Sequence, residues 1–569
     1  MTTRWEFADV DAGAVQRLAD ELSIHPMTAK ILVKRGIVDP DLARIFLAPE
    51  LSQLHDPFLL PDMDVAVARL IVAMTDNEAI TICGDYDTDG VCSTALLLRF
   101  LRQIGARVDH YIPHRERDGY GLQAAAVTQL VARGSTLLVT VDNGTGALEA
   151  VAAASAAGLD VIITDHHEVG DALPKALAIV NPKRADAKYP FTGLCGAGVA
   201  FKLLMALRQR LRTTGWFATH PEPNLRELLD LVAVATVADV VPLIDENRIL
   251  VAHGLRQLQR QPKIGLRELL RVAGTPSDRI DSYALGFQLS PRLNAAGRLA
   301  HADLALELLA TEDTARAAVL AGELNALNAQ RQQTEARIIA QIRERIALVP
   351  DLHSRSSLVL ADVAWPVGVV GIVAGRIAET YRLPAVVIGL PGEVGRGSAR
   401  TVGNFPLLES IAACRDSLQH FGGHEAAAGL TIAADRVEQF TNDFEVAARA
   451  RLQPSMREKS LRADAEITVS ELSRELTDEL QRLGPFGMGN PEPLLVVRGA
   501  QVERRRIVGN NHLQLRVRQQ QTILPAIGFS MGQHPAIDAA VVDLIGTPTL
   551  NTWQGATTVQ LRMRDFMAS

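Results

Sequence analysis

Short apolar runs alternate with longer, Ala-rich helical stretches over residues 79–180. Buried parallel strands have this near-continuous apolar character, and the segments between the runs are long enough for crossover helices. The pattern therefore predicts a parallel sheet with helices on both faces, an α/β fold. The five predicted strands are AITIC (79–83), RVDHYI (107–112), TLLVTV (136–141), DVIIT (160–164) and ALAIV (176–180).

Three other patterns divide the rest of the chain. A polar–apolar helical run from Leu304 to Val349 predicts one long helix that spans two domains. A second α/β unit begins near Ser357, and short alternating strands after Arg462 predict a small β-barrel of the OB kind. The predicted parts are an N-terminal helical segment (1–75), a first α/β domain (76–300), a connecting helix (301–350), a second α/β domain (351–455) and a barrel (456–569).

Carboxylates gather directly after the first predicted strand. Asp85, Asp87 and Asp89 lie within five residues, and like charges this close repel one another unless a cation lies among them. A calcium EF-hand loop matches at its first, third, fifth and sixth positions. It fails at the twelfth, where Leu96 replaces the bidentate glutamate. The flanks are also a strand and a helix rather than two helices, which excludes the EF-hand.

Two further strands end in the same kind of residue. Asp142 follows the third strand, Asp165-His166-His167 follow the fourth, and Asp239 ends a later apolar segment. A single aspartate after a strand is most often a helix cap, and Asp-Asn-Gly is a common turn. Because ligands of open parallel sheets bind beyond the carboxyl ends of the strands, we expect all these side chains in one crevice. Oxygen ligands with imidazole favour Mg²⁺ or Mn²⁺, and the number of carboxylates suits two ions.

Four motifs occur in an order that resembles the DHH phosphoesterase superfamily: DYDTDG, TVDNG, TDHH and TVADVVPL. Further segments resemble the RecJ family of single-stranded-DNA-specific exonucleases, and the resemblance covers essentially the whole chain. It implies a DHH catalytic domain, a DHH-associated second domain and a C-terminal OB-like barrel. These further segments are PRLNAAGR (291–298), GVVGIVAGRI (368–377), GRGSAR (395–400), FGGHEAAAGL (421–430) and GPFGMGNPEP (484–493).

The resemblance implies that six residues bind two Mg²⁺ or Mn²⁺ ions. Asp142 would bridge the ions, while His166 and Asp239 would complete the better-occupied site. Asp165 and His167 would assist catalysis, with His167 beside the attacking water. The six metal ligands would be Asp85, Asp87, Asp89, Asp142, His166 and Asp239.

The resemblance also implies a group of residues that hold DNA phosphates, including the terminal 5′ phosphate. Arginine forks suit phosphate, and a serine beside glycine amides makes a close anion cradle. One position departs from the family pattern, because many members carry Trp-His where this chain has Trp365-Pro366. The phosphate-binding residues would be Arg115, Arg298, Ser398, Arg400 and His424.

The implied activity is degradation of single-stranded DNA from 5′ to 3′, releasing mononucleotides by metal-assisted phosphodiester hydrolysis in DNA repair and recombination. One alternative is a DHH phosphodiesterase of short oligonucleotides or cyclic dinucleotides, although those relatives are much shorter. Another is a non-catalytic DNA-binding scaffold, although such relatives lose the carboxylates that are all present here. The implied partners are single-stranded DNA, a single-stranded-DNA-binding protein and a repair helicase.

Composition adds limits of its own. The chain has 569 residues, of which 47% are hydrophobic and 22% charged, as expected for a globular protein of several domains. The net charge of −7 does not by itself indicate a nucleic-acid partner, although such a footprint is local rather than global. The four cysteines are scattered, which suits reduced core residues. No run approaches the ~18 apolar residues of a membrane span, so we expect a cytoplasmic protein without a membrane partner. We also expect the protein to be a monomer.

Overall fold

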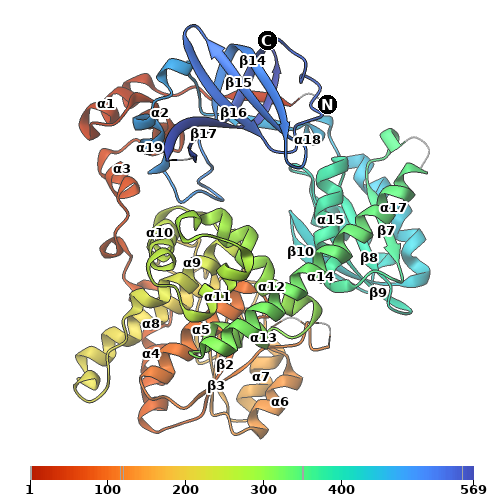
Figure 1. The fold of residues 1–569 in the computed structure, drawn as a ribbon. Coiled ribbons are helices and arrows are strands. Elements are labelled where there is room, and N and C mark those ends of the chain that lie inside the picture. The colour runs from red at the N-terminus through yellow and green to blue at the C-terminus, as the bar shows by residue number, and fades with distance from the viewer. Residues whose placement is uncertain (1–2, 116, 120, 349–351, 554) are drawn as a thin grey trace.

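The ribbon forms a ring of four parts in a computed structural model of the chain (Figure 1). The first α/β domain lies opposite the C-terminal barrel. The second α/β domain joins them on one side, and the N-terminal segment joins them on the other (Figure 1). The structure describes residues 3–115, 117–119, 121–348, 352–553 and 555–569.

The first α/β domain contains the predicted parallel sheet. Its five strands have the order β3-β2-β4-β5-β6, and every neighbouring pair is parallel. All five apolar runs therefore form strands, as predicted. Their bounds are β2 Ile80–Cys83, β3 Val108–Tyr111, β4 Leu137–Val141, β5 Asp160–Thr164 and β6 Ala178–Val180.

Helices cover both faces of this sheet. Successive residues of a strand point to opposite faces of the sheet, so the strands contribute to two different cores. Ile82 packs with α5 and α8 on one face, whereas Leu138 packs with α6 and α7 on the other. Further helices thicken the first core, and a π-helical turn runs directly into α12. The helices are α4 Met63–Thr75, α5 Thr88–Gln103, α6 Ala124–Ala132, α7 Leu148–Ala156, α8 Gly196–Thr213, α9 Leu229–Ala238, α10 Asp245–Arg260, α11 Ile264–Ala273, η6 Ala284–Leu289 and α12 Ser290–Leu299.

The prediction of one connecting helix was wrong, because the chain forms two. Helix α13 spans Asp303–Ala310 and α14 spans Thr314–Ala347. Asp313 starts α14 by accepting hydrogen bonds from the backbone N–H groups of Ala315 (2.8 Å) and Arg316 (3.2 Å). An aspartate N-cap is a start signal, so the break was present in the sequence. Residues 349 and 350, the predicted end of the helix, lie outside the described residues.

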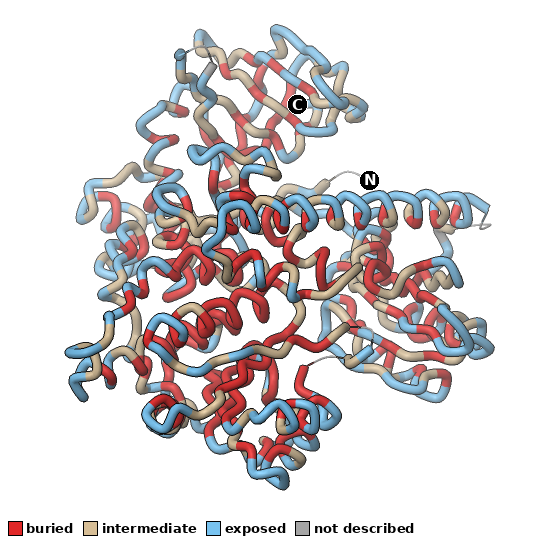
Figure 2. The backbone as a smooth tube through the Cα atoms, turned by 60° about the horizontal axis from the view of Figure 1, so that its bottom comes forward, coloured by how far each residue is buried: buried red, intermediate tan, exposed pale blue. Residues whose placement is uncertain are grey.

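Helix α14 belongs to two hydrophobic cores. Its first half, through residues such as Leu320 and Leu324, packs in the core of the first domain. Its second half, through Ile338 and Ile342, packs in the core of the second domain. Figure 2 shows the helix with buried positions along one side and exposed positions along the other. The connecting helix is thus a structural part of both domains.

The second α/β domain has a mixed sheet of order β10-β11-β9-β8-β7, in which only β7 and β8 are parallel. Helix α15 contacts one face of this sheet, and α16 and α17 pack with the apolar residues of the other face. The elements are β7 Leu358–Asp362, α15 Val367–Tyr381, β8 Ala385–Gly389, β9 Val394–Arg400, α16 Leu407–Ala412, β10 His420–His424, β11 Ala427–Ala433 and α17 Val437–Arg451.

The C-terminal strands form the predicted OB barrel, which is closed by pairing of β14 with β17. Strand β17 was not predicted, because Gly546 and Pro548 interrupt its apolar pattern. The strands are β13 Ala465–Glu466, β14 Leu495–Val508, β15 His512–Gln519, β16 Thr522–Gly528, β17 Val541–Trp553 and β18 Ala556–Ala568.

The N-terminal segment is less helical than predicted, since it opens with a strand. Strand β1 (Arg4–Phe7) pairs in parallel with β12 (Ser460–Ala463), just before the barrel. The helices that follow pack in the same hydrophobic core as the barrel strands and α19. The two ends of the chain therefore meet in one structural unit. These helices are α1 Ala12–Leu22, α2 Pro26–Lys34, α3 Pro40–Leu47 and α19 Arg474–Gln481.

Two predictions from composition concern buried thiols and membrane spans. Within the described residues, all four cysteines are buried free thiols. No described helix combines the length and the apolar character that a membrane crossing requires.

Candidate metal centre and phosphate groove

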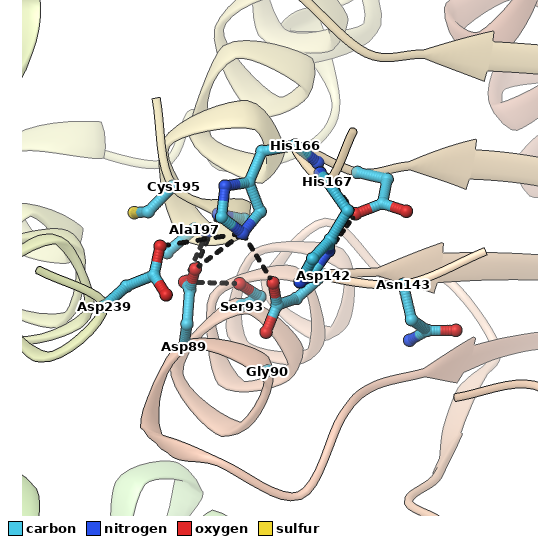
Figure 3. A network of polar contacts seen from close by, with 12 residues as sticks. Asp89, Gly90, Ser93, Asp142, Asn143, His166, His167, Cys195, Ala197 and Asp239 are labelled. Carbon is cyan, nitrogen blue, oxygen red and sulfur yellow. Dashed lines mark hydrogen bonds and ion pairs between the residues drawn. The ribbon is translucent and has the colours of Figure 1, made fainter. Parts of the chain in front are cut away.

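The predicted carboxylates and histidines meet at the carboxyl edge of the parallel sheet. Asp89 lies in the first turn of α5, Asp142 follows β4, and His166 lies two residues after β5. Asp239 reaches the same place from the C-terminal end of α9. Figure 3 shows the carboxylates of Asp89, Asp142 and Asp239 around the ring of His166. Strands and helices far apart in the sequence thus supply one polar cluster.

Helix N-termini hold the carboxylates in place. Asp87 is the N-cap of α5 and accepts the backbone N–H of Asp89 at 2.9 Å. Asp89 in turn accepts the backbone N–H groups of Gly196 (2.6 Å) and Ala197 (2.8 Å), where α8 begins. Positive partial charge at a helix N-terminus stabilises such an anion. Gly196 is needed there, because an added Cβ atom would lie 2.6 Å from the Cβ atom of Asp142.

His166 is the centre of the cluster. Its Nε2 atom lies 3.0 Å from Asp142 Oδ1, 3.6 Å from Asp239 Oδ2 and 3.8 Å from Asp89 Oδ2. Burial, with the nearby charge of His167, lowers the pKa of His166 to about 3. The imidazole is therefore neutral near pH 7, which is the form that binds a metal ion.

The donor atoms form three overlapping sets, each compact enough to hold a cation. Within each set, the ligand atoms lie within 4.8 Å of one another. Asp142 belongs to two of the sets and His166 to two, so neighbouring cations would share ligands. The sets are Asp85 with Asp87 and Asp142; Asp89 with His166 and Asp239; and Asp142 with His166 and His167.

The electrostatics of the cluster favour binding of a cation. Burial raises the pKa of Asp89 to about 7, and the charge of Asp87 adds to the effect. Burial also raises the pKa of Asp239 to about 8, again with help from neighbouring carboxylates. The pKa values of Asp85 and Asp142 are raised for the same two reasons. Without a cation these acids retain protons near neutral pH, so a metal ion would displace protons on binding.

The donor chemistry fits a hard divalent cation. Within the described part of the chain, Asp85 Oδ1 is buried and has no hydrogen-bond partner. An unsatisfied buried oxygen is costly unless a ligand or ion completes it. Carboxylate oxygens with one or two imidazoles suit Mg²⁺ or Mn²⁺, and the buried thiols of Cys83 and Cys92 lie outside the three donor sets.

Asp165 lies behind the cluster and orients His167. Its Oδ1 atom lies 2.7 Å from His167 Nδ1, and its Oδ2 atom accepts the backbone N–H of Thr145 at 2.8 Å. Burial alone would lower the pKa of His167, but the hydrogen bond and charge of Asp165 raise it to about 9. Burial alone would raise the pKa of Asp165, yet the bond from His167 holds it below its usual range. The pair keeps a proton on His167 Nδ1.

A large cavity of about 1190 Å³ lies between the two α/β domains. We call this cavity the phosphate groove. Four of the five predicted phosphate-binding residues line it, and Tyr86 of the metal-site loop lines it too. Glycines of α15 make close packing possible, since an added Cβ on Gly371 would lie 3.1 Å from Ser398 Oγ and 3.3 Å from Arg400 Nη2. The four lining residues that were predicted are Arg115, Arg298, Ser398 and Arg400.

Each lining arginine has a distinct setting. Arg298 is mostly buried and donates to the backbone O of Gly368 at 3.0 Å, across the domain boundary. Arg400 Nη1 donates to Ser398 Oγ at 2.8 Å, and Arg115 lies over the ring of Tyr86 at 4.9 Å. Burial lowers the pKa of Arg298 to about 10, which still leaves it charged at neutral pH.

The predicted phosphate-binding residues and the residues that line the cavity differ in two ways. His424 ends strand β10 and is exposed, and the described residues that line the cavity do not include it. Conversely, the cavity is lined by Arg376, Arg396 and His420, which were not predicted. Arg396 lies in the quoted GRGSAR segment, so only its strand alternation with Ser398 and Arg400 could have identified it.

Three family models match the chain, in the order in which its parts occur. The DHH family N-terminal domain matches residues 79–236, the DHHA1 domain residues 355–450 and the RecJ OB domain residues 463–565. A single-stranded-DNA-specific exonuclease RecJ from Dickeya dadantii is 39% identical over 95% of each chain. This chain belongs to the RecJ family.

Solved RecJ structures agree with this assignment. RecJ from Thermus thermophilus in complex with Mn²⁺ is similar with a TM-score of 0.84 and 30% identity, over 99% of this chain and 79% of that one. The Mg²⁺ complex of RecJ from the same organism is similar with a TM-score of 0.79 and the same identity, over 99% and 78% of the two chains. The RecJ fold therefore extends through all four parts of the molecule.

Proposed function

We propose that this protein is a single-stranded-DNA-specific exonuclease that hydrolyses phosphodiester bonds with Mg²⁺ or Mn²⁺. One observation carries the proposal: a buried cluster of carboxyl and imidazole ligands adjoins a large groove lined by arginines. Helix α12 joins the two, because Asn294 accepts the backbone N–H of Thr88 at 2.8 Å while Arg298 lines the groove. Membership of the RecJ family, and the metals bound by the T. thermophilus protein, support it.

In this proposal, each group of residues has a separate task. Asp89, Asp142 and His166 would be central among the ligands of two cations, which supply Lewis acidity and a nucleophilic water. His167, oriented by Asp165, offers a proton at the edge of the cluster where charge develops on the phosphoryl group or the leaving oxygen. The groove arginines bind phosphates and position the strand.

The finer features of the activity rest on the groove. We propose that the 5′-terminal phosphate binds Ser398, Arg400, Arg298 and Arg115, which sets a 5′→3′ direction and the release of mononucleotides. We propose that the groove is too narrow for duplex, so that it selects single strands without reading bases. We also propose that the enzyme works as a cytoplasmic monomer with a single-stranded-DNA-binding protein and a repair helicase.

The test uses linear single strands labelled at the 5′ or the 3′ end, the matched duplex, and a single-stranded circle, each with and without Mn²⁺. We expect metal-dependent loss of the linear strand, early release of the 5′ label as a mononucleotide, and survival of the duplex and the circle. Cutting of the circle would indicate an endonuclease. Hydrolysis of a cyclic dinucleotide alone would indicate the small-substrate phosphodiesterase instead.

A further inference from the structure

The face of the second sheet that lines the cavity carries polar residues in rows. Strand register places Arg396 beside Thr431, and Thr431 beside His420, on β9, β11 and β10. Directly paired residues of neighbouring strands point to the same face, and all three residues line the cavity. One row thus presents a guanidinium, a hydroxyl and an imidazole side by side.

A second row separates this one from the terminal-phosphate residues. Ser398, Gly429 and Gly422 are paired in register, and Cβ atoms added to the two glycines would meet nothing within 4 Å. The floor of the groove is therefore open between Arg400 and Arg396. Two residues along a strand advance about 6.6 Å, so the Arg396 row lies one such step beyond Ser398 and two beyond Arg400.

The cavity is also larger than one phosphate requires, and its charge extends past Ser398. Arg376 of α15 lines it together with Arg396, and among the described lining residues Glu379 supplies the one carboxylate. Arg376 also lies 3.4 Å from Glu335 of α14. The far part of the groove therefore presents two guanidinium groups with further hydrogen-bond donors, which is the chemistry that phosphate oxygens select.

We propose that Arg396, Thr431 and His420 form a second phosphate-binding subsite, beyond the one for the terminal phosphate of the proposed exonuclease. It takes a further phosphate group at the 5′ end of the strand. That group is either part of a 5′-triphosphate or the phosphate of one more nucleotide. In the second case the strand has two registers, and cleavage releases a dinucleotide as well as a mononucleotide.

The first experiment measures binding without cleavage. The full chain is titrated in EDTA against 3′-fluorescein oligothymidylate that carries either a 5′-monophosphate or a 5′-triphosphate, with anisotropy as the readout. We expect wild type to prefer the triphosphate about tenfold, as one charge-assisted contact provides. Arg396→Ala and His420→Ala should reduce this ratio. Both side chains are exposed, so these variants should fold. Arg436→Ala, an exposed arginine outside the lining, is the matched control.

The second experiment separates the two sources of the phosphate. Strands with a 5′-monophosphate are cleaved in Mn²⁺, and the ratio of dinucleotide to mononucleotide products is measured. A ratio that falls in Arg396→Ala but not in Arg436→Ala assigns the subsite to the extra nucleotide. A change in the binding ratio alone assigns it to the triphosphate.

The subsite is refuted if Arg396→Ala and His420→Ala match Arg436→Ala in both experiments. The binding arm needs no catalysis, so it stays informative if the proposed nuclease activity fails. Conversely, normal single-strand digestion with unchanged ratios would overturn the subsite and leave the proposed function intact.

Discussion

The candidate metal centre and the proposed phosphate groove differ in their electrostatics. Asp89 and Asp142 have only 1% and 2% of their surface exposed and crowd together at the edge of a parallel sheet. Arg396 and His420 lie on one face of a sheet, with their side chains exposed to solvent. Burial of like charges makes the first site dependent on an added cation, whereas the second can accept an anion as it is. Chemistry and strand capture can therefore be disrupted separately.

The strongest disruption of the metal centre is Asp142→Ala. Because Asp142 belongs to two of the three ligand sets, its loss should weaken both cation positions. We expect cleavage to fall by more than the roughly 10–100-fold that loss of an outer partner costs. The rate of single-strand digestion in saturating Mn²⁺ measures this. Asp171→Ala, at an exposed loop position, is the control, and near-wild-type digestion by Asp142→Ala would sink the shared-ligand assignment.

A smaller loss of activity is expected from Asp165→Asn, which changes the residue that orients His167. The amide cannot stabilise the charged imidazole of His167, so the His167 pKa should fall from about 9 toward its ordinary value near 6.5. Activity should fall roughly 10–100-fold, as for other residues that orient a functional histidine. The pKa is read by NMR titration of the metal-free protein. An unchanged His167 titration would show that Asp165 does not control this proton.

On the groove side, Arg400→Ala should affect binding before chemistry. It removes one phosphate contact, so the slope of log affinity against log salt should flatten by about one unit. The affinity of metal-free protein for a 5′-phosphorylated strand is measured between 50 and 200 mM salt, values chosen from the usual range for such slopes. If affinity and slope stay the same while turnover vanishes, Arg400 is not a phosphate ligand.

The smallest effect concerns stability, and it sharpens the electrostatic contrast. Asp89 and Asp239 have pKa values of about 7 and 8 when folded, above the unfolded value near 3.9. The folded state then binds more protons, so metal-free protein should lose stability as pH rises from 6.5 to 8.5. Bound Mn²⁺ should remove this loss. The gap in Tm between Mn²⁺ and EDTA should therefore widen by a few degrees over this range, and an equal gap at both pH values would contradict it.

The sequence predicted the metal centre better than the groove, for a physical reason. Carboxyl ends of parallel strands share one edge, so Asp142 and His166 could be brought together from strand order alone. The partnership of Arg396 with His420 depends on hairpin register and on how the cavity forms between domains, which no local pattern specifies. The missed break before α14 is different, because Asp313 is an ordinary N-cap signal that the long helical pattern obscured.

Helix α14 couples the unfolding of the two α/β domains. Leu320 lies in one domain core and Ile342 in the other, on a single helix whose rise separates them by about 33 Å. Melting either core would expose half of this helix and strip apolar contacts from its remaining turns. The two domains therefore open together as one cooperative unit rather than fraying one at a time. The distance between the candidate metal centre and the proposed phosphate groove is thus kept for as long as this unit stays folded.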